Sequence, residues 1–520
     1  MSEIVILFLN TDFEHDIYEL IRAFYPGSEL ISLYREEDLP SPESRTPDSG
    51  AVCFLVRQSG SLSYQILCRK DGSEITADAE LVPCSAEENR EISKKERLAV
   101  RKENKDRIKY SLYNMLSELT GKKLPWGSLT GIRPAKLAMN LLEEGAANTS
   151  IARELRERYL VSPAKTALAV TIANREKAIL DSFDYRTGYS LYIGIPFCPS
   201  ICLYCSFSSY PLAAYQKMVE PYLEALFLEA DAVSRIMKSS GLRLDTIYIG
   251  GGTPTTLEPD QLRRLLDCLG EKFGFDTAME FTVEAGRPDS ITEEKLQALR
   301  EYPVSRISVN PQTMNQETLD LIGRRHTSEQ TVRAFRLARE QGFDNINMDI
   351  IIGLPGENIS MVRSTLRQIQ ELDPDSLTVH TLAVKRAARL NIFRDQYQEM
   401  TFEANQEIMD VCLLAAREMG MGPYYMYRQK NMKGNFENVG YAREGKSCLY
   451  NILIMEERQP IIALGAGGAS KLYFPSENRI ERIENVKDVA SYISRIQEMI
   501  DRKHTGLAPY IQAGGYAESM

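Results

Sequence analysis

The chain has 520 residues, of which 43% are hydrophobic and 26% charged, and its formal net charge is -10 at pH 7. This length supports about two to four domains with packed cores. The acidic balance argues against a general nucleic-acid or anionic-membrane binder, because both need a basic face. No apolar run reaches the roughly 20 residues of a membrane-spanning helix. The opening MSEIVILFLNTDFEHD lacks the basic lead-in and cleavage site of a signal peptide.

The nine cysteines, in a chain without a secretion signal, indicate a reducing compartment. We therefore expect a cytoplasmic protein. Six cysteines are scattered singly, and we expect them to be small buried apolar side chains. They are Cys53, Cys68, Cys84, Cys268, Cys412 and Cys448.

The N-terminal part is predicted to hold two regions, a small α/β or β-rich domain over 1–85 and a mainly helical region over 86–187. Strand-like runs occupy 4–10, 51–58 and 62–72, the last running into a turn. Ser85 and Glu88 have the spacing of a capping box, which predicts that a charged helix begins there and continues to residue 107.

Short strands then alternate with helices from residue 189 to about 385. The expected strands are SLYIGIP, DTIYIGG, EFTVEA, RISVN, INMDIII and SLTVHTL. In one intervening helix, the leucines at 262, 265, 266 and 269 repeat at the interval of a single helix face. Six βα units predict a parallel sheet covered by helices, and six rather than eight predicts an open, partial (β/α)6 barrel over 188–395.

Residues 396–520 are expected to form a separate C-terminal α+β lobe. Helices are predicted in EANQEIMDVCLLAAREMG and VKDVASYISRIQEMI, and a strand is predicted in LYNILIME (449–456). The predicted fold class is therefore α/β: a partial barrel with an N-terminal α/β plus helical extension and a C-terminal lobe.

The remaining cysteines, Cys198, Cys202 and Cys205, follow the first barrel strand in a C-x3-C-x2-C spacing. Active sites of such barrels collect at the carboxyl ends of the strands. Three thiolates with no histidine nearby can hold zinc, given a fourth ligand from elsewhere. They can also hold three irons of a [4Fe–4S] cluster and leave the fourth iron open to a substrate or cofactor. The spacing alone leaves both alternatives open.

The surroundings of the cysteines resemble a known superfamily. YIGIPFCPSICLYCSF resembles the cluster loop of radical S-adenosylmethionine (SAM) enzymes, and GGGTPT (250–255) resembles their glycine-rich SAM motif. VEAGRPDSIT, RISVNPQTMN, LIGRRHT and MDIIIGLPGE follow in the order seen in oxygen-independent coproporphyrinogen III oxidases. LPWGSLTGIRPAKL and VGYAREGKSCLYN are similar to the HemZ-type branch of that family, which is assigned as coproporphyrinogen dehydrogenase.

The resemblance implies roles for individual residues. Cys198, Cys202 and Cys205 would ligate the cluster, whose open iron would take the amino and carboxylate groups of SAM. Arg324 would meet the SAM carboxylate. The residues implied in SAM binding are Tyr192, Tyr204, Gly251, Gly252, Thr253, Glu284, Gln312, Arg324, Asp349, Ala383 and, more weakly, Ala469.

The reaction implied is an oxidative decarboxylation. A reduced cluster splits SAM into methionine and a 5′-deoxyadenosyl radical, which takes hydrogen from the β-carbon of a substrate propionate. Loss of CO2 and one further electron leaves a vinyl group, and two such events give protoporphyrinogen IX. An electron donor such as a flavodoxin or ferredoxin is expected. Candidate partners for the substrate carboxylates are Lys385, Arg386, Arg428 and Lys430.

Two positions depart from the family pattern. Gly194 stands where the first strand usually carries a histidine, and Phe207 stands where the best-understood oxidases have a fourth cysteine. Two alternatives therefore remain, a haem-trafficking chaperone and a radical SAM enzyme with another substrate, RNA included. Chaperone relatives carry a His-Asn…Tyr-Trp segment, which here reads GNFENVGYA without histidine or tryptophan, and this favours the enzyme.

Overall fold

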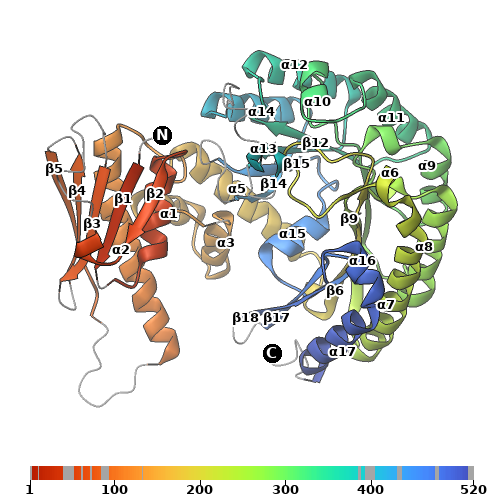
Figure 1. Cartoon of the computed structure of the whole chain (residues 1–520), viewed down its shortest axis with the longest axis horizontal. Helices are drawn as coiled ribbons and strands as arrows, with labels where there is room; N and C mark the ends of the chain where they lie inside the picture. The colour runs from red at the N-terminus through yellow and green to blue at the C-terminus, as the bar shows by residue number, and fades with distance from the viewer. Residues whose placement is uncertain are drawn as a thin grey trace. The chain divides into compact units, whose positions relative to one another are not determined.

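The structure is a computed structural model of the chain, shown in Figure 1. It describes residues 3–9, 11–38, 52–59, 63–70, 73–83, 93–131, 133–383, 388–392, 404–429, 436–474 and 479–512. The chain divides into two compact units, one of Met1–Thr171 with Gly434–Phe436 and one of Ile172–Lys433 with Glu437–Met520. Within the described ranges, no helix is both long and apolar enough to cross a membrane. The four domain ranges expected from the sequence stay predictions.

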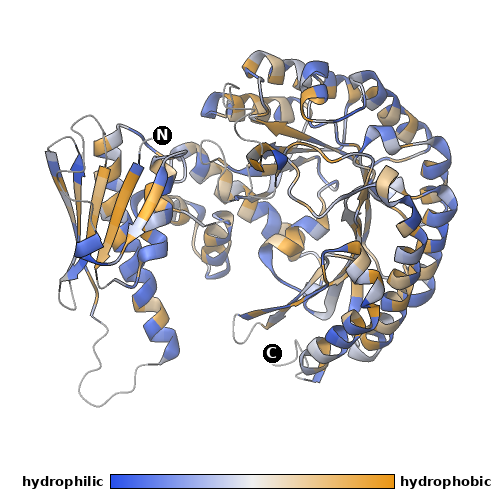
Figure 2. Cartoon of the chain, viewed as in Figure 1, coloured by the Kyte–Doolittle hydropathy of each residue, from blue (hydrophilic) through white to orange (hydrophobic). Residues whose placement is uncertain are grey.

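The N-terminal unit is built on a five-stranded sheet in the order β2-β1-β3-β4-β5. Its strands are β1 (Glu3–Leu9), β2 (Glu29–Leu33), β3 (Val52–Ser59), β4 (Ser63–Lys70) and β5 (Ser73–Glu80). Helices α1 (Glu14–Phe24) and α2 (Lys94–Thr120) pack their buried faces into the same core as the sheet. Figure 2 shows the central strands as largely hydrophobic, as burial against helices requires. Three further helices follow in the chain: α3 (Ala135–Glu143), α4 (Asn148–Glu157) and α5 (Pro163–Leu180), of which α5 belongs to the second unit from Ile172 on.

Helix α2 begins later than the sequence predicts. Its capping box is made by Ser93 and Glu96, in which the Glu96 N–H donates to Ser93 Oγ at 3.2 Å and the Ser93 N–H donates to Glu96 Oε2 at 2.9 Å. The Ser85–Glu88 pair lies outside the described residues. The same four-residue signature therefore occurs twice, and the second copy caps the helix.

The second unit contains the predicted partial barrel. Six parallel strands pair in chain order, each with the next. They are β6 (Gly188–Ile195), β9 (Arg243–Gly251), β10 (Glu280–Glu284), β11 (Arg306–Ser308), β12 (Ile346–Ile352) and β13 (Ser376–Thr381). Figure 1 shows the connecting helices along the outer face of this curved sheet. They are α7 (Val219–Ser240), α8 (Pro259–Phe273), α9 (Glu293–Arg300), α10 (Gln316–Leu321), α11 (Ser328–Glu340) and α12 (Ile359–Leu372).

The strands of the C-terminal part extend the barrel sheet at both edges. Strands β14 (Gly422–Tyr427) and β15 (Asn438–Ala442) add antiparallel to β13, and β16 (Ile461–Leu464) adds parallel to β6. Strands β17 (Ala469–Phe474) and β18 (Arg479–Glu484) complete an 11-stranded sheet in the described residues. The predicted helices appear as α14 (Gln406–Glu418), α16 (Val489–Ser494) and α17 (Ile496–Gln512).

The strand predicted in LYNILIME is wrong, because Leu449–Glu456 form helix α15. A tertiary contact from β10 favours the helix. Glu280 accepts hydrogen bonds from the Leu449 N–H at 2.6 Å, the Tyr450 N–H at 3.2 Å and Cys448 Sγ at 3.3 Å. A carboxylate that is distant in the sequence thus caps the first turn of α15. The hydrophobic pattern of the segment cannot predict such a contact. In Figure 1, α15 lies on the inner side of the curved sheet.

Candidate functional site

The three clustered cysteines lie on the loop that follows β6, at the carboxyl end of the parallel strands. Cys202 is buried, and Cys198 and Cys205 are half-buried. The pKa of Cys198 is raised to about 11, mainly by burial and in part by the nearby Cys205 and Cys202 thiols, although the hydrogen bond from Thr253 lowers it. Among the described residues, no three His, Cys, Asp or Glu side chains already surround one metal position. That finding does not bear on a cluster, in which each thiolate binds a different iron.

The isolated cysteines behave mostly as expected. Cys68, Cys412 and Cys448 are buried, whereas Cys53 and Cys268 are half-buried. Cys84 lies outside the described residues.

The glycine-rich motif after β9 packs directly against the cysteine loop. The Gly252 N–H donates to the Ile195 carbonyl at 2.7 Å, and the Thr253 N–H donates to the Phe197 carbonyl at 2.8 Å. Thr253 Oγ1 donates to Cys198 Sγ at 3.5 Å. A Cβ atom at Gly252 would lie 2.6 Å from the Phe197 carbonyl oxygen. The glycine is therefore required for the close approach of the two loops, whatever the motif also binds.

Aromatic and acidic side chains gather on neighbouring strands of the barrel. Tyr192 of β6 stacks on Tyr248 of β9 at 6.2 Å between ring centroids, and Tyr450 of α15 stacks on Tyr248 at 4.5 Å. Tyr248 donates from its hydroxyl to Glu284 Oε1. Burial raises the pKa of Glu284 from its ordinary value near 4.5 to about 7. Tyr248 and Tyr450 were not singled out by the sequence motifs.

Asp349 and His380 form a polar pair on β12 and β13. His380 Nε2 lies 3.6 Å from Asp349 Oδ2, and Asn347 Nδ2 donates to Asp349 Oδ1 at 2.6 Å. Burial would raise the pKa of Asp349, but these partners hold it below its usual value. Asp349 is therefore ionised, while Glu284 can carry a proton near neutral pH.

Gln312 is held in an unusual backbone conformation beside Asp349. Its φ is +67°, a region that residues other than glycine rarely adopt. Its N–H donates to the Asp349 carbonyl at 2.9 Å, which bridges the loop after β11 to β12. Strained backbone of this kind is concentrated at functional sites.

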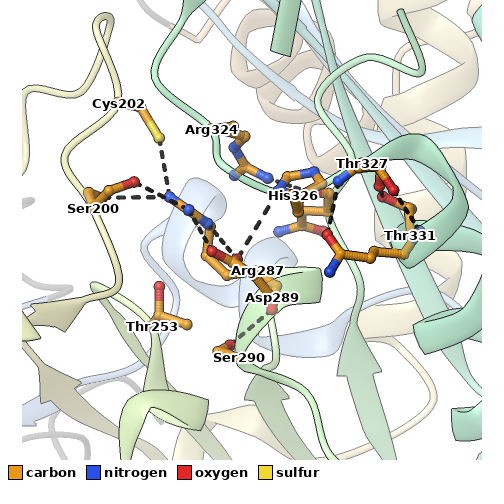
Figure 3. Close-up of polar contacts among 12 residues, drawn as sticks. Ser200, Cys202, Thr253, Arg287, Asp289, Ser290, Arg324, His326, Thr327 and Thr331 are labelled. Carbon is orange, nitrogen blue, oxygen red and sulfur yellow. Dashed lines mark hydrogen bonds and ion pairs between the residues drawn. The ribbon is translucent and has the colours of Figure 1, made fainter. Parts of the chain in front are cut away.

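Arg324 lies inside the structure beside the cysteine loop. It is 5% exposed, its Nη1 donates to the Asn310 carbonyl at 2.5 Å, and it interacts with Tyr204 and Cys202. Arg287, which sequence reasoning did not single out, approaches Cys202 as well, as Figure 3 shows. The only signal for Arg287 in the sequence is its place in the VEAGRPDSIT motif.

The remaining sequence-predicted residues are only partly placed. Ala383 follows β13. Ala469 is the first residue of β17, and β17 begins at the end of the barrel where the parallel strands β6 and β16 finish. Arg428 is buried just after β14. Lys385, Arg386 and Lys430 lie outside the described residues, so their predicted contacts with a substrate stay predictions.

The site fits a polar cofactor. Buried polar atoms in proteins are normally hydrogen-bonded. At the end of β11 and in the loops beyond it, several buried polar atoms have no partner among the described residues: Ser308 Oγ, Asn310 Oδ1, Gln312 Oε1 and Arg324 Nε. These donors and acceptors suit a small molecule with amino, carboxylate and hydroxyl groups, such as SAM.

Known proteins are similar to this chain in sequence. Residues 192–369 match the sequence model of the Radical SAM superfamily. The "oxygen-independent coproporphyrinogen-III oxidase-like protein HemZ" of Bacillus subtilis (strain 168) is 41% identical over 404 residues, which cover 77% of this chain and 81% of HemZ. The "heme chaperone HemW" of the same organism is 39% identical over 315 residues, covering 59% of this chain and 76% of HemW.

One solved structure is also similar. The coproporphyrinogen III oxidase HemN of Escherichia coli, described as a radical SAM enzyme, is 24% identical with a TM-score of 0.48. The match covers 60% of this chain and 70% of that one.

The sequence match and the six-stranded partial barrel define a radical SAM protein, and the superfamily's cofactors are a [4Fe–4S] cluster and SAM. Within that superfamily, the chain belongs to the family of HemZ-like, oxygen-independent coproporphyrinogen-III oxidase-like proteins.

Proposed function

We propose that the chain is a radical SAM oxidoreductase that converts two propionates of coproporphyrinogen III to vinyl groups, giving protoporphyrinogen IX. The observation that carries this proposal is the 41% identity to HemZ, which spans 81% of that relative. The described site supports it, because cysteine, glycine-motif and strand-end residues meet at one end of the barrel. The reduced cluster and SAM, when bound, supply the radical that removes hydrogen from the propionate.

The chain's own residues hold the reactants. Cys198, Cys202 and Cys205 supply the three cluster thiolates. Gln312 Oε1 and Arg324 Nε, buried without partners in the described chain, offer SAM an acceptor and a cation. The other SAM contacts proposed from the family motif are Tyr192, Tyr204, Gly251, Gly252, Thr253, Glu284, Asp349, Ala383 and Ala469. A flavodoxin- or ferredoxin-class donor would supply the electron to the bound cluster.

A haem-trafficking chaperone is the second candidate function. The 39% identity to HemW favours it. Of the barrel histidines that the structure describes, His326 is fully buried, and His380 lies near Asp349 and the Tyr427 hydroxyl. A chaperone would therefore need to release His380 from these neighbours, or to use another ligand, before binding haem iron.

An anaerobic assay separates the two functions. Reconstituted protein is incubated with dithionite, SAM and coproporphyrinogen III, and 5′-deoxyadenosine and porphyrins are quantified, with Cys202→Ala as the control. Vinyl products in step with 5′-deoxyadenosine support the oxidoreductase. Stoichiometric haem uptake without vinyl products favours the chaperone, and 5′-deoxyadenosine with neither result favours another substrate.

A further inference from the structure

Arg287 is a buried arginine beside the cysteine loop, and the proposed reaction gives it no role. Arg287 lies between β10 and the short helix η7 (Pro288–Ser290) and is 3% exposed. Figure 3 shows its guanidinium between Cys202 and Asp289. Its Nη1 lies 3.5 Å from Cys202 Sγ and donates to the Ser200 carbonyl at 3.3 Å. The arginine thus touches both the backbone and a thiol of the cysteine loop.

The guanidinium is held in one orientation by a two-point contact. Arg287 Nε donates to Asp289 Oδ1 at 2.9 Å, and Nη2 donates to Asp289 Oδ2 at 2.8 Å. Nη2 also donates to Ser200 Oγ at 3.1 Å. Because Nε and Nη2 both face Asp289, the remaining nitrogen, Nη1, is directed to Cys202. A bidentate contact of this kind gives geometric specificity that a lysine cannot reproduce.

The charge nearest to Cys202 is therefore positive. Asp289 binds the edge of Arg287 away from the thiol, and Arg324 adds a second guanidinium close to Cys202. His326, whose Nδ1 lies 3.9 Å from Asp289 Oδ1, is fully buried. Electrostatic interactions in such a buried site are much stronger than in water.

We propose that Arg287 is a positioning residue that raises the reduction potential of the cluster by donating a hydrogen bond and presenting a positive charge to the Cys202 thiolate. This rests on the proposed role of Cys202 as a cluster ligand. Hydrogen bonds to the sulfurs and net charge set the potentials of iron–sulfur clusters. One electron passes from a flavodoxin- or ferredoxin-class donor to the cluster, which becomes more negative by one charge, while the donor is oxidised by one electron. A fixed cation stabilises that more negative state.

The test is the reduction potential of the cluster in full-length, anaerobically reconstituted protein. Arg287→Gln removes the positive charge of the guanidinium and its two-point contact with Asp289. At a given solution potential, we expect the ratio of reduced to oxidised cluster to fall at least tenfold, which is about 59 mV for a one-electron couple. The ratio is followed by electron paramagnetic resonance during redox titration, and iron and sulfide are counted in each sample.

Arg263→Gln is the matched control, because Arg263 is an arginine at the surface of α8 that pairs with Glu301 through a similar fork. We expect it to keep the wild-type potential. A fully loaded Arg287→Gln protein with the same potential as Arg263→Gln overturns the proposal. If Arg287→Gln takes up no iron, Arg287→Lys decides, because a single ammonium cannot hold Asp289 in a fork and also reach the thiolate. A wild-type potential in Arg287→Lys then overturns the proposal.

A separate experiment tests whether Cys202 is a cluster ligand. If Cys202→Ala keeps the full four irons, Cys202 is not a ligand and the basis of the proposal is lost. If Cys202→Ala loses the cluster but Arg287→Gln leaves the potential unchanged, the assignment stands and only the role of Arg287 is wrong.

Discussion

Tyr248 and Glu284 are joined by a hydrogen bond between neighbouring strands, with the tyrosine hydroxyl 2.5 Å from Glu284 Oε1. The pKa of Glu284 is raised to about 7, mainly by burial and in part by Asp349, although the hydrogen bond from Tyr248 lowers it. Glu284 therefore changes its charge within the physiological pH range. The hydrogen bond from Tyr248 lowers the pH at which this change occurs.

SAM affinity should depend on pH through Glu284. If the ionised carboxylate binds the amino or hydroxyl groups of SAM, affinity should rise about tenfold between pH 6 and pH 8, since an acid of pKa about 7 is mostly protonated at the lower value and mostly ionised at the upper. Equilibrium dialysis at both pH values measures this. Glu284→Gln should bind weakly and without pH dependence. Tyr248→Phe should shift the affinity profile to higher pH, and Tyr302→Phe on the surface should not. An unshifted profile in Tyr248→Phe contradicts the coupling.

Glu284 should also make the cofactor-free chain less stable at high pH. A carboxyl group whose pKa is raised on folding binds more protons in the folded state, so its contribution is complete below pH 4.5 and is lost as pH rises through 7. The loss should be about 2 kcal/mol in the free energy of unfolding. Denaturant titrations of wild type and Glu284→Gln at pH 5 and 8 measure it. Equal losses in both proteins would place the titrating group elsewhere.

Gly252→Ala should disrupt the cofactor site. Its Cβ would lie 2.6 Å from the Phe197 carbonyl oxygen and 2.9 Å from the Ile195 carbonyl oxygen, which are rigid backbone atoms. We expect at least a tenfold loss of SAM affinity and reduced cluster loading, measured by dialysis and iron analysis. Gly131→Ala is the steric control, because Gly131 is exposed, has no positive φ and has no atom within 4 Å of its Cβ. Wild-type binding by Gly252→Ala would show that the loops can separate without cost.

Glu280→Ala should destabilise helix α15, which carries Tyr450. It removes the acceptor of the Leu449 and Tyr450 N–H groups, which are then left without their cap. The cost should be about 1–3 kcal/mol in the free energy of unfolding, the usual penalty for buried groups left unpaired. Asn358→Ala, which removes the exposed side-chain cap of α12, should cost about 1 kcal/mol. A smaller loss in Glu280→Ala than in Asn358→Ala would contradict the role of the buried cap.

Cys202→Ala should lose the cluster. Without the thiolate, we expect anaerobically reconstituted protein to lose both the visible absorbance of the cluster and the cleavage of SAM. Cys268→Ala, which changes a half-buried cysteine on α8, should load iron as the wild type does. Loss of iron in both variants would point to general instability instead.

The barrel was predictable because its signals are local. Buried parallel strands are short apolar runs, and the covering helices repeat leucines at helical spacing, so the six strands and α8 appear in the sequence as they do in the structure. Local signals failed where a partner lies far along the chain. LYNILIME has no side-chain cap from its own N-cap residue, and the N–H groups of its first turn donate to Glu280 of β10 instead. Ser85 and Glu88 have the same local signature as Ser93 and Glu96, so the sequence could not choose between them.

By itself, the sequence determined the superfamily, the cysteine loop, the glycine motif and the order of the barrel strands, because each is a short pattern of neighbouring residues. Only the tertiary structure decided which distant groups face those motifs. Arg287 meets Cys202 across 85 positions, and Tyr248 meets Glu284 across 36. The physical reason is that a parallel sheet brings the ends of successive strands together, and no local spacing records which side chains then touch.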